Sequence, residues 1–170
     1  TENQLKRINR MYPQHKRLLR KQGEYAKPVA ELDLSKYETK LTVLPGTHPG
    51  GINAAGIDNF SKNTDGSISG ITASPDNYLA FGNGNSFDMS TGNVVKITAK
   101  IPEGNAMRLY FTTTDSQNWA EAKATSTTVS TTADFADYYF NFSENKNWKG
   151  TLLWYRLDVS STKGDEFVVK

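Results

Sequence analysis

The sequence predicts an all-β protein built as an antiparallel sandwich of two sheets. Short stretches of alternating apolar and polar residues recur along most of the 170 residues, and turn clusters such as Asp65-Gly66 and Thr91-Gly92-Asn93 separate them. Eight Phe, eight Tyr and three Trp residues supply large apolar surfaces to a chain that is rich in Thr, Ser, Asn and Gly. A chain of this length can bury one sizeable core, so we expect one sandwich domain with an N-terminal extension.

Eight segments of the predicted sandwich domain, residues 52–170, carry the strand pattern. They are Ser67–Ala73, Tyr78–Gly82, Val94–Ile101, Met107–Thr113, Trp119–Thr125, Asp137–Phe142, Thr151–Val159 and Glu166–Val169. Because successive side chains of a strand point to opposite faces, the alternation also predicts which side chains face outward. Among these outward residues are Arg108, Tyr110, Tyr139 and Asn141.

The first 23 residues are predicted to form a basic helical arm. Seven Lys or Arg residues against Glu2 give residues 1–22 a net charge of +6, so the remainder carries −4 of the total of +2. Apolar side chains recur at the spacing of one helix face, and they include Leu5, Ile8, Tyr12 and Leu19. Pro13 divides the stretch into two short helices, at about residues 2–11 and 13–22. Such an arm either packs on its own domain or docks on a partner or a neighbouring subunit. Nucleic acid or another acidic surface is a lesser alternative, because a basic amphipathic segment can bind either.

Residues 24–51 are predicted to be an extended connector with one strand. Alternation favours a strand over residues 37–44, and the turn-forming residues Pro45–Gly51 that follow mark the predicted domain boundary. His48 lies in this turn with no cysteine or second histidine nearby, which argues against a metal-binding role.

Composition argues against several classes of protein. The chain has no cysteine, so it has neither a disulfide framework nor a zinc–thiolate site. Its apolar runs are too short to span a membrane, and its N-terminus is too polar and basic for a secretory signal. We therefore expect a virion or extracellular protein without a membrane partner. The mixed, slightly acidic charge of residues 23–170 argues against a nucleic-acid partner.

The C-terminal segment resembles a known family. WKGTLLWYRLDVSSTKGDEFVV, residues 148–169, is similar to the closing strands of jelly-roll, galactose-binding-like carbohydrate-binding modules. The residues that match the family pattern are Trp148, Gly150, Leu152, Arg156, Leu157 and Asp158, whereas Val159 replaces a proline. The resemblance covers about residues 68–170. It implies a jelly-roll sandwich in which Trp148 and the Arg156–Asp158 pair are structural.

Sugar recognition by such sandwiches uses exposed aromatic rings and flanking polar groups, because a pyranose has an apolar face and hydroxyls that need partners. The glycan-contact candidates are Arg108, Tyr110, Trp119, Tyr139 and Asn141. They form one surface only if their strands are neighbours. Trp119 begins a predicted strand, so it is either a core residue or a ligand contact.

Leu153 and Trp154 depart from the family pattern, which places polar residues at these positions. An exposed Leu-Trp pair indicates either a ligand platform or a protein contact, and we favour the protein contact. The helical-face residues of the arm are the other interface candidates.

No catalytic set stands out among the 18 acidic residues, and no nucleophile–base pair is visible, so we expect no enzymatic activity. No cofactor is expected. A structural calcium ion is an open alternative because Asp65, Asp76 and Asp165 lie in turns, although they lack EF-hand-like spacing.

The sequence thus favours a non-catalytic binding protein. Our first hypothesis is a bacteriophage virion component, such as a head or tail fibre or decoration protein, whose sandwich attaches to a surface glycan and whose arm docks on the particle. The first alternative is a purely architectural virion subunit without sugar binding. The second is an accessory module of a secreted polysaccharide-degrading enzyme.

Overall fold

A computed structural model of the chain describes residues 33–82, 86–102, 106–128 and 134–170. The predicted helical arm, with Leu5, Ile8, Tyr12 and Leu19, lies outside these residues. The chain divides between Thr39 and Lys40, and the sandwich belongs to residues 40–170. Among the described residues, none of the helices has the length and apolar character needed to cross a membrane.

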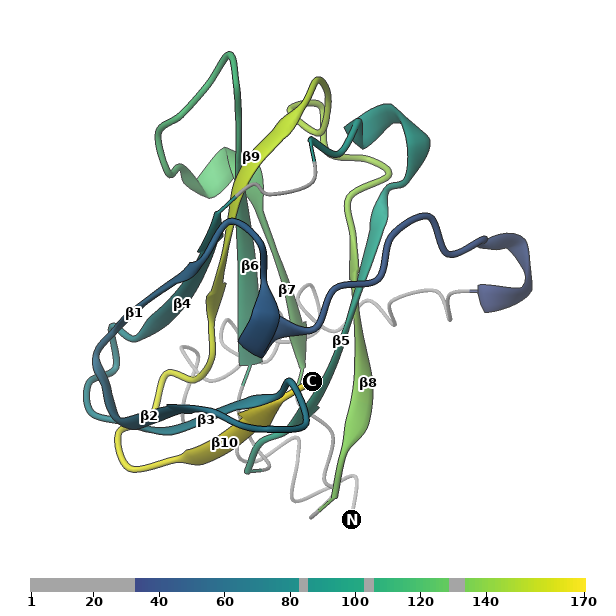
Figure 1. Cartoon of the computed structure of the whole chain (residues 1–170). Helices are drawn as coiled ribbons and strands as arrows, with labels where there is room; N and C mark the ends of the chain where they lie inside the picture. Colours follow the sequence, from purple (N-terminus) through teal and green to yellow (C-terminus); the bar gives the residue numbers. More distant parts are fainter. Residues whose placement is uncertain (1–32, 83–85, 103–105, 129–133) are drawn as a thin grey trace, which may run out of the picture. The chain divides into compact units, whose positions relative to one another are not determined.

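The described residues form two five-stranded antiparallel sheets (Figure 1). Sheet A has the order β1 (Ile52–Ala55), β4 (Tyr78–Gly82), β9 (Leu152–Asp158), β6 (Ala106–Thr113) and β7 (Ala124–Thr128). Sheet B has the order β2 (Ile57–Lys62), β3 (Ile68–Thr72), β10 (Glu166–Val169), β5 (Val94–Lys100) and β8 (Ala136–Asn141). Short 3-10 helices lie in the connections: η1 (Leu34–Lys36), η2 (Pro45–Thr47), η3 (Met89–Thr91) and η4 (Glu121–Lys123).

Strands β3 to β10 follow a nested pairing scheme. β3 pairs with β10 and β5 with β8 in sheet B, whereas β4 pairs with β9 and β6 with β7 in sheet A. These eight strands therefore form one long antiparallel hairpin, rolled so that successive pairs fall alternately in the two sheets. This is the jelly-roll arrangement, and it confirms the predicted all-β sandwich.

The core lies between the inward faces of the two sheets. Leu157 and Leu79 of sheet A and Phe140 of sheet B are completely buried. A buried side chain of this size contributes about 1.5–3 kcal/mol to stability. Trp148 closes one end of the core: its ring stacks on Phe142 at a centroid distance of 4.2 Å. Its indole N–H donates to the Met89 carbonyl at 3.0 Å, so the structural role predicted for Trp148 is confirmed.

Most predicted strands are confirmed with shifts of one residue or less at their ends, but two are wrong. In the predicted strand 119–125, residues 119–123 form a loop and η4, and β7 begins only at Ala124. The reason is Lys123, which is buried and whose ammonium group donates to the Ser116 carbonyl at 3.0 Å, so the chain folds back before the strand starts. Residues 37–44 form no strand. The short strands β1 and β2 were not predicted.

The turn at Pro45–Gly51 packs on the sandwich instead of marking its boundary. His48 is 7% exposed, and its ring lies 5.6 Å from that of Phe81 and 5.4 Å from that of Tyr155. The Gly82 amide donates to the Gly51 carbonyl at 3.1 Å, which extends the pairing of β1 with β4. The unit therefore begins before the predicted boundary, because an apolar contact holds this turn on sheet A.

The buried His48 predicts a pH-dependent stability. Burial lowers the pKa of His48 below its ordinary value of 6.5. The unfolded chain therefore binds a proton more readily than the folded one, and the free energy of unfolding should fall as the pH is lowered from about 7.5 to about 5. Urea denaturation across this range measures the effect.

His48→Gln is the matched variant, because it retains an acceptor for the Gly50 amide that now donates to His48 Nδ1 at 3.2 Å but does not titrate. Its stability should depend less on pH over this range than that of the wild type. The same slope in both proteins would show that His48 is not the group responsible.

Candidate functional site

The outer face of sheet A brings together polar and aromatic side chains of three strands. Arg156 of β9 lies opposite Ala80 of β4 and Tyr110 of β6, and Trp154 lies opposite Gly82 and Thr112 in the next outward row. We call this region the sheet A surface, and it consists of Tyr78, Arg108, Tyr110, Trp154, Arg156 and Asp158.

Arg156 lies at the centre of the sheet A surface. Its Nε donates to Asp158 Oδ1 at 2.6 Å and its Nη2 donates to Asp158 Oδ2 at 3.1 Å, so these two residues of the same strand face pair with each other. Nη2 also donates to Asp76 Oδ1 at 3.4 Å. The guanidinium carbon lies 4.3 Å from the ring centroid of Tyr78 and 5.4 Å from that of Tyr110, within the range of cation–π attraction. Hydrogen bonds and ring contacts together therefore hold the guanidinium group.

A second polar cluster adjoins Arg156 on β6. The Tyr110 hydroxyl donates to Glu121 Oε1 at 2.7 Å, and Arg108 forms an ion pair with the other oxygen of Glu121. Arg108 Nε is buried and has no hydrogen-bond partner in the described residues. Glu121 reaches this position because Lys123, two residues later, fastens the loop to Ser116. The loop between β6 and β7 thus contributes directly to the sheet A surface.

The pKa shifts of the sheet A surface reflect a balance between burial and the contacts that these groups make with one another. Burial raises the pKa of Asp158 and outweighs the opposing hydrogen bond from Arg156. Burial alone would lower the pKa of Arg156, but the hydrogen bonds and charge of Asp158 raise it above its usual value. Burial and the hydrogen bond to Glu121 raise the pKa of Tyr110, which keeps this phenol protonated as a donor.

The sequence predicted that Leu153 and Trp154 form an exposed pair. The structure corrects this, because both side chains are half-buried. The register between β6 and β9 shifts beside Leu153, which lies at the irregularity in the pairing. The Trp154 ring lies against the backbone at Gly82, where an added Cβ would lie 3.1 Å from Trp154 Cη2. Trp154 therefore offers one part of its ring on the sheet A surface and covers the sheet with the rest.

The structure separates the five predicted glycan contacts into three places. Arg108 and Tyr110 belong to the sheet A surface, whereas Tyr139 and Asn141 lie on β8 of sheet B, on the other side of the sandwich (Figure 1). Trp119 lies in the loop before η4 and is 39% exposed, so it is not a core residue. The five residues do not form one surface, because β6 and β8 belong to different sheets.

Three residues that contact Arg156 or Tyr110 were not predicted for a ligand-binding surface: Tyr78 and Glu121 were not considered, and Asp76 was considered only for calcium. Tyr78 shares the outward face of its strand with Ala80 and Gly82, so alternation could have found its direction. The loop residues Asp76 and Glu121 carry no periodic signal. Only the fold brings them to Arg156 and Tyr110.

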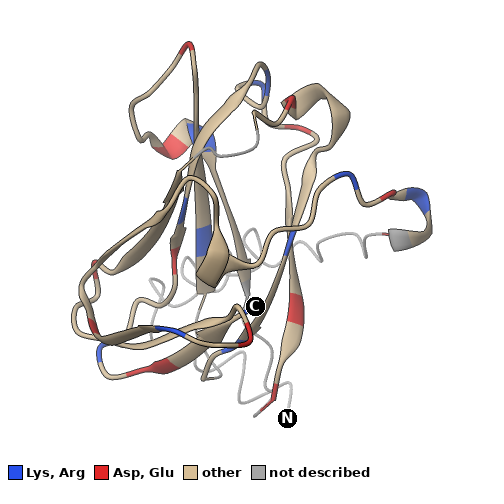
Figure 2. Ribbon diagram, viewed as in Figure 1, with Lys and Arg blue, Asp and Glu red and all other residues tan. Residues whose placement is uncertain are grey.

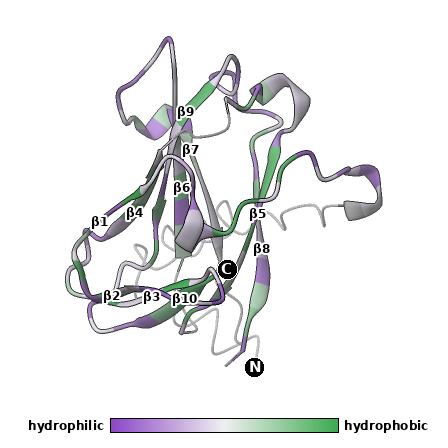
Figure 3. Cartoon of the chain, viewed as in Figure 1, coloured by the Kyte–Doolittle hydropathy of each residue, from purple (hydrophilic) through white to green (hydrophobic). Residues whose placement is uncertain are grey.

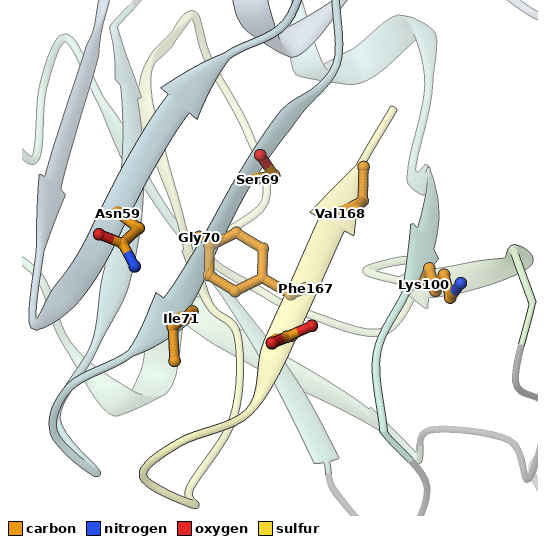
Figure 4. A pocket seen from close by; sticks show the side chains of 8 residues that line it. Asn59, Ser69, Gly70, Ile71, Lys100, Phe167 and Val168 are labelled. Carbon is orange, nitrogen blue, oxygen red and sulfur yellow. The ribbon is translucent and has the colours of Figure 1, made fainter.

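A shallow groove of about 300 Å³ lies on the outer face of sheet B (Figure 4). Figure 4 shows that its side chains come from β2, β3, β10 and β5; they are Asn59, Ser69, Gly70, Ile71, Lys100, Glu166, Phe167 and Val168. The aromatic residue of the lining, Phe167, is only 2% exposed and packs in the core. The groove therefore offers no open ring for stacking, and the sheet A surface is the better candidate for a sugar.

The three carboxylates considered for calcium lie in separate contacts. Asp65 accepts hydrogen bonds from the amide and hydroxyl of Ser67, and Asp165 accepts one from the Ser160 hydroxyl at 2.6 Å. Asp76 accepts from Arg156. Within the described ranges, no three His, Asp or Glu side chains gather where they could hold a metal ion. Figure 2 shows Lys and Arg positions interspersed with Asp and Glu positions along the described strands and loops.

No known protein family matches the sequence, and no curated protein matches it. Solved structures similar to the chain include a family 29 carbohydrate-binding module with a TM-score of 0.48 and 15% identity, covering 72% of this chain and 76% of that one. A variant family 29 module complexed with cellulohexaose has a TM-score of 0.49 and 14% identity, with coverages of 76% and 85%. A low-affinity xylan-binding module, CBM86, from Roseburia intestinalis has a TM-score of 0.42 and 12% identity, with coverages of 71% and 93%.

The contacts of Arg156 predict a substantial contribution to stability. Arg156→Ala would leave the half-buried Asp158 carboxylate without its bidentate donor and would uncover the Tyr78 ring. We expect the free energy of unfolding to fall by about 1–3 kcal/mol, as measured by urea denaturation.

Lys96→Ala is the control, because the Lys96–Asp137 ion pair is longer, at 3.5 Å, and its side chains are 55% and 42% exposed. Its loss should change stability by about 0–1 kcal/mol. Equal losses in the two variants would contradict a special role for the Arg156 cluster.

Proposed function

We propose that this chain is a non-catalytic glycan-binding protein that holds a polysaccharide on the sheet A surface. Tyr78, Tyr110 and Trp154 are half-buried, and the parts of their rings that Arg156 and the sheet leave accessible suit the apolar faces of sugar rings. Arg108 and Asp158 flank this area with groups that can hydrogen-bond hydroxyls. A binding surface on the outer face of a sheet also suits an extended chain of sugars.

The observation that carries the proposal is the position of the Arg156 guanidinium, in contact with Tyr78 and Tyr110 on an outward-facing row. Asp158 holds the Arg156 side chain, and Glu121 holds Tyr110. Because these side chains are already ordered, a ligand that contacts them loses less conformational entropy on binding. The arrangement therefore favours recognition of a ligand by a prepared surface.

The same contacts support a binding role over a catalytic one. Asp158 accepts two hydrogen bonds from Arg156, and Glu121 accepts from Tyr110 and pairs with Arg108. Glycoside hydrolysis uses one carboxyl group as an acid and a second as a base or nucleophile, on the two sides of a bound sugar. Asp158 and Glu121 are occupied by hydrogen bonds and ion pairs with neighbouring arginine and tyrosine side chains. They are therefore better suited to holding these side chains in place than to acting as an acid, base or nucleophile.

The proposal is tested by binding measurements on a polysaccharide array, followed by titration calorimetry with any polysaccharide that is bound. Tyr110→Ala should weaken binding roughly two- to tenfold, because stacking on an aromatic ring contributes about 0.5–1.5 kcal/mol. Tyr110→Phe tests the hydroxyl separately, since it retains the ring and loses the bond to Glu121.

Tyr139→Ala is the matched control, because Tyr139 is a half-exposed tyrosine on the outer face of sheet B. It should bind like the wild type. A wild type that binds no polysaccharide, or equal losses in Tyr110→Ala and Tyr139→Ala, would refute the proposed surface.

We further propose that the protein is a component of a bacteriophage particle. The basic, amphipathic pattern of residues 1–22 supports an arm that docks on other proteins of a bacteriophage virion, with the sandwich displayed for host attachment. A purely architectural subunit would use the same arm without sugar binding. An accessory module of a secreted enzyme would be joined to its catalytic domain by a neutral, flexible linker, which this stretch does not resemble.

Deletion of residues 1–22 tests whether the arm docks the protein on a particle. If the arm is a docking element, the truncated chain should be absent from purified particles while it still binds the polysaccharide that the full chain binds. Mass spectrometry of the particles measures incorporation. Incorporation of the truncated chain at the level of the full chain would exclude the docking role.

A further inference from the structure

The hairpin of β6 and β7 has a long loop. β6 ends at Thr113 and β7 begins at Ala124, so ten residues, 114–123, lie between two strands that pair directly. Hairpin loops usually have about two to five residues, and longer loops often carry a function. Figure 3 shows hydrophilic colouring over much of this loop, which also carries the large side chain of Trp119.

A buried lysine fixes the shape of the loop. Lys123 is 5% exposed, and its ammonium group donates to the Ser116 carbonyl and hydroxyl, each at 3.0 Å, and to Asn118 Oδ1 at 3.1 Å. Burying a cation is unfavourable unless its hydrogen bonds are satisfied, and here the loop supplies all three acceptors. The side-chain amide of Asn147, before β9, donates to the Ala122 carbonyl at 2.9 Å. The loop is therefore held in one shape from within and from outside.

Trp119 is exposed on this ordered loop. Its side chain is 39% exposed, and the other exposed large hydrophobic side chains of the described residues all precede β1. Asn118, directly before it, accepts from Lys123. Glu121, two residues after it, accepts from the Tyr110 hydroxyl at 2.7 Å. Because both neighbours are fixed, Trp119 is held at the end of the sheet A surface where the loop adjoins Tyr110.

We propose that Trp119 is a further glycan contact, which extends the sheet A surface past Tyr110 along a bound sugar chain. This role rests on the proposed glycan binding, and it adds that the ligand is a chain that continues beyond the sheet. An indole ring suits the apolar face of a pyranose, and a ring on an ordered loop loses little conformational entropy on binding. Its contribution should therefore grow with the length of the sugar chain.

Oligosaccharides of two lengths test the contact with the full chain. The probes come from xylan, mannan and mixed-linkage β-glucan, which are neutral, because Arg108 and Arg156 already pair with carboxylates. Trp119→Ala should weaken binding of the hexasaccharide roughly two- to tenfold, as measured by titration calorimetry. Its effect on the trisaccharide should be smaller. Hexasaccharide binding like that of the wild type would overturn the contact, and equal losses for both sugars would overturn the extension along the chain.

Trp119→Phe retains a ring and should recover part of the affinity that Trp119→Ala loses. Tyr37→Ala is the matched control, because Tyr37 is exposed to a similar degree, at 42%, but belongs to residues 1–39, outside the unit that contains the sandwich. It should bind like the wild type. If Tyr110→Ala weakens binding and Trp119→Ala does not, the role of Trp119 is refuted and the sheet A surface is not. If the wild type binds none of the three polysaccharides, both are refuted.

Release of the loop gives an independent test. Lys123→Met retains an apolar stem but removes the ammonium group, so it should weaken hexasaccharide binding. The loss should be smaller in the Trp119→Ala background, because the ring that the loop positions is then absent. Asn118→Ala removes one acceptor of the ammonium group and gives the same comparison if Lys123→Met does not fold. Equal losses in the two backgrounds would overturn the link between the order of the loop and Trp119.

Discussion

The burial of two apolar sheet faces against each other is the interaction on which this structure depends. Leu157 at the centre of sheet A and Phe140 of sheet B are excluded from solvent by this contact. Because side chains alternate along a strand, a residue that is held inward forces its neighbours outward. Leu157 in the core thus places Arg156 and Asp158 on the outer face, and the sheet A surface is a consequence of the core.

The sheet A surface also shows how a polar face is ordered without being buried. Arg156 donates to two carboxylates and lies near two tyrosine rings, while Glu121 holds Tyr110 and Arg108. Each contact is modest at a partly exposed site, but the shared partners restrict one another. A surface ordered in this way can present ring faces and hydrogen-bonding groups in fixed positions, which is what recognition of a sugar chain requires.

The failures of sequence-based prediction have specific physical causes. Residues 119–125 alternate like a strand. The buried ammonium group of Lys123 donates a hydrogen bond to the Ser116 carbonyl in the preceding loop, and β7 therefore begins after Lys123. Tyr139 was grouped with Tyr110 because both point outward, yet the two outward directions belong to opposite sheets. Residues 37–44 alternate like a strand but form none. Alternation alone does not make a strand, since a strand also needs a neighbouring strand to which its backbone can hydrogen-bond.

The sequence by itself determined the all-β class, the positions of most strands and the inward or outward direction of their side chains, including the common face of Arg156 and Asp158. These properties are local, since they depend on the period of two and on turn-forming residues. Only the tertiary structure decided which strands are neighbours, that β6 and β8 lie in different sheets, and that Asp76, Tyr78 and Glu121 join the surface. The physical reason is that backbone hydrogen bonds are the same for every residue, so packing of the whole chain selects the partner of each strand.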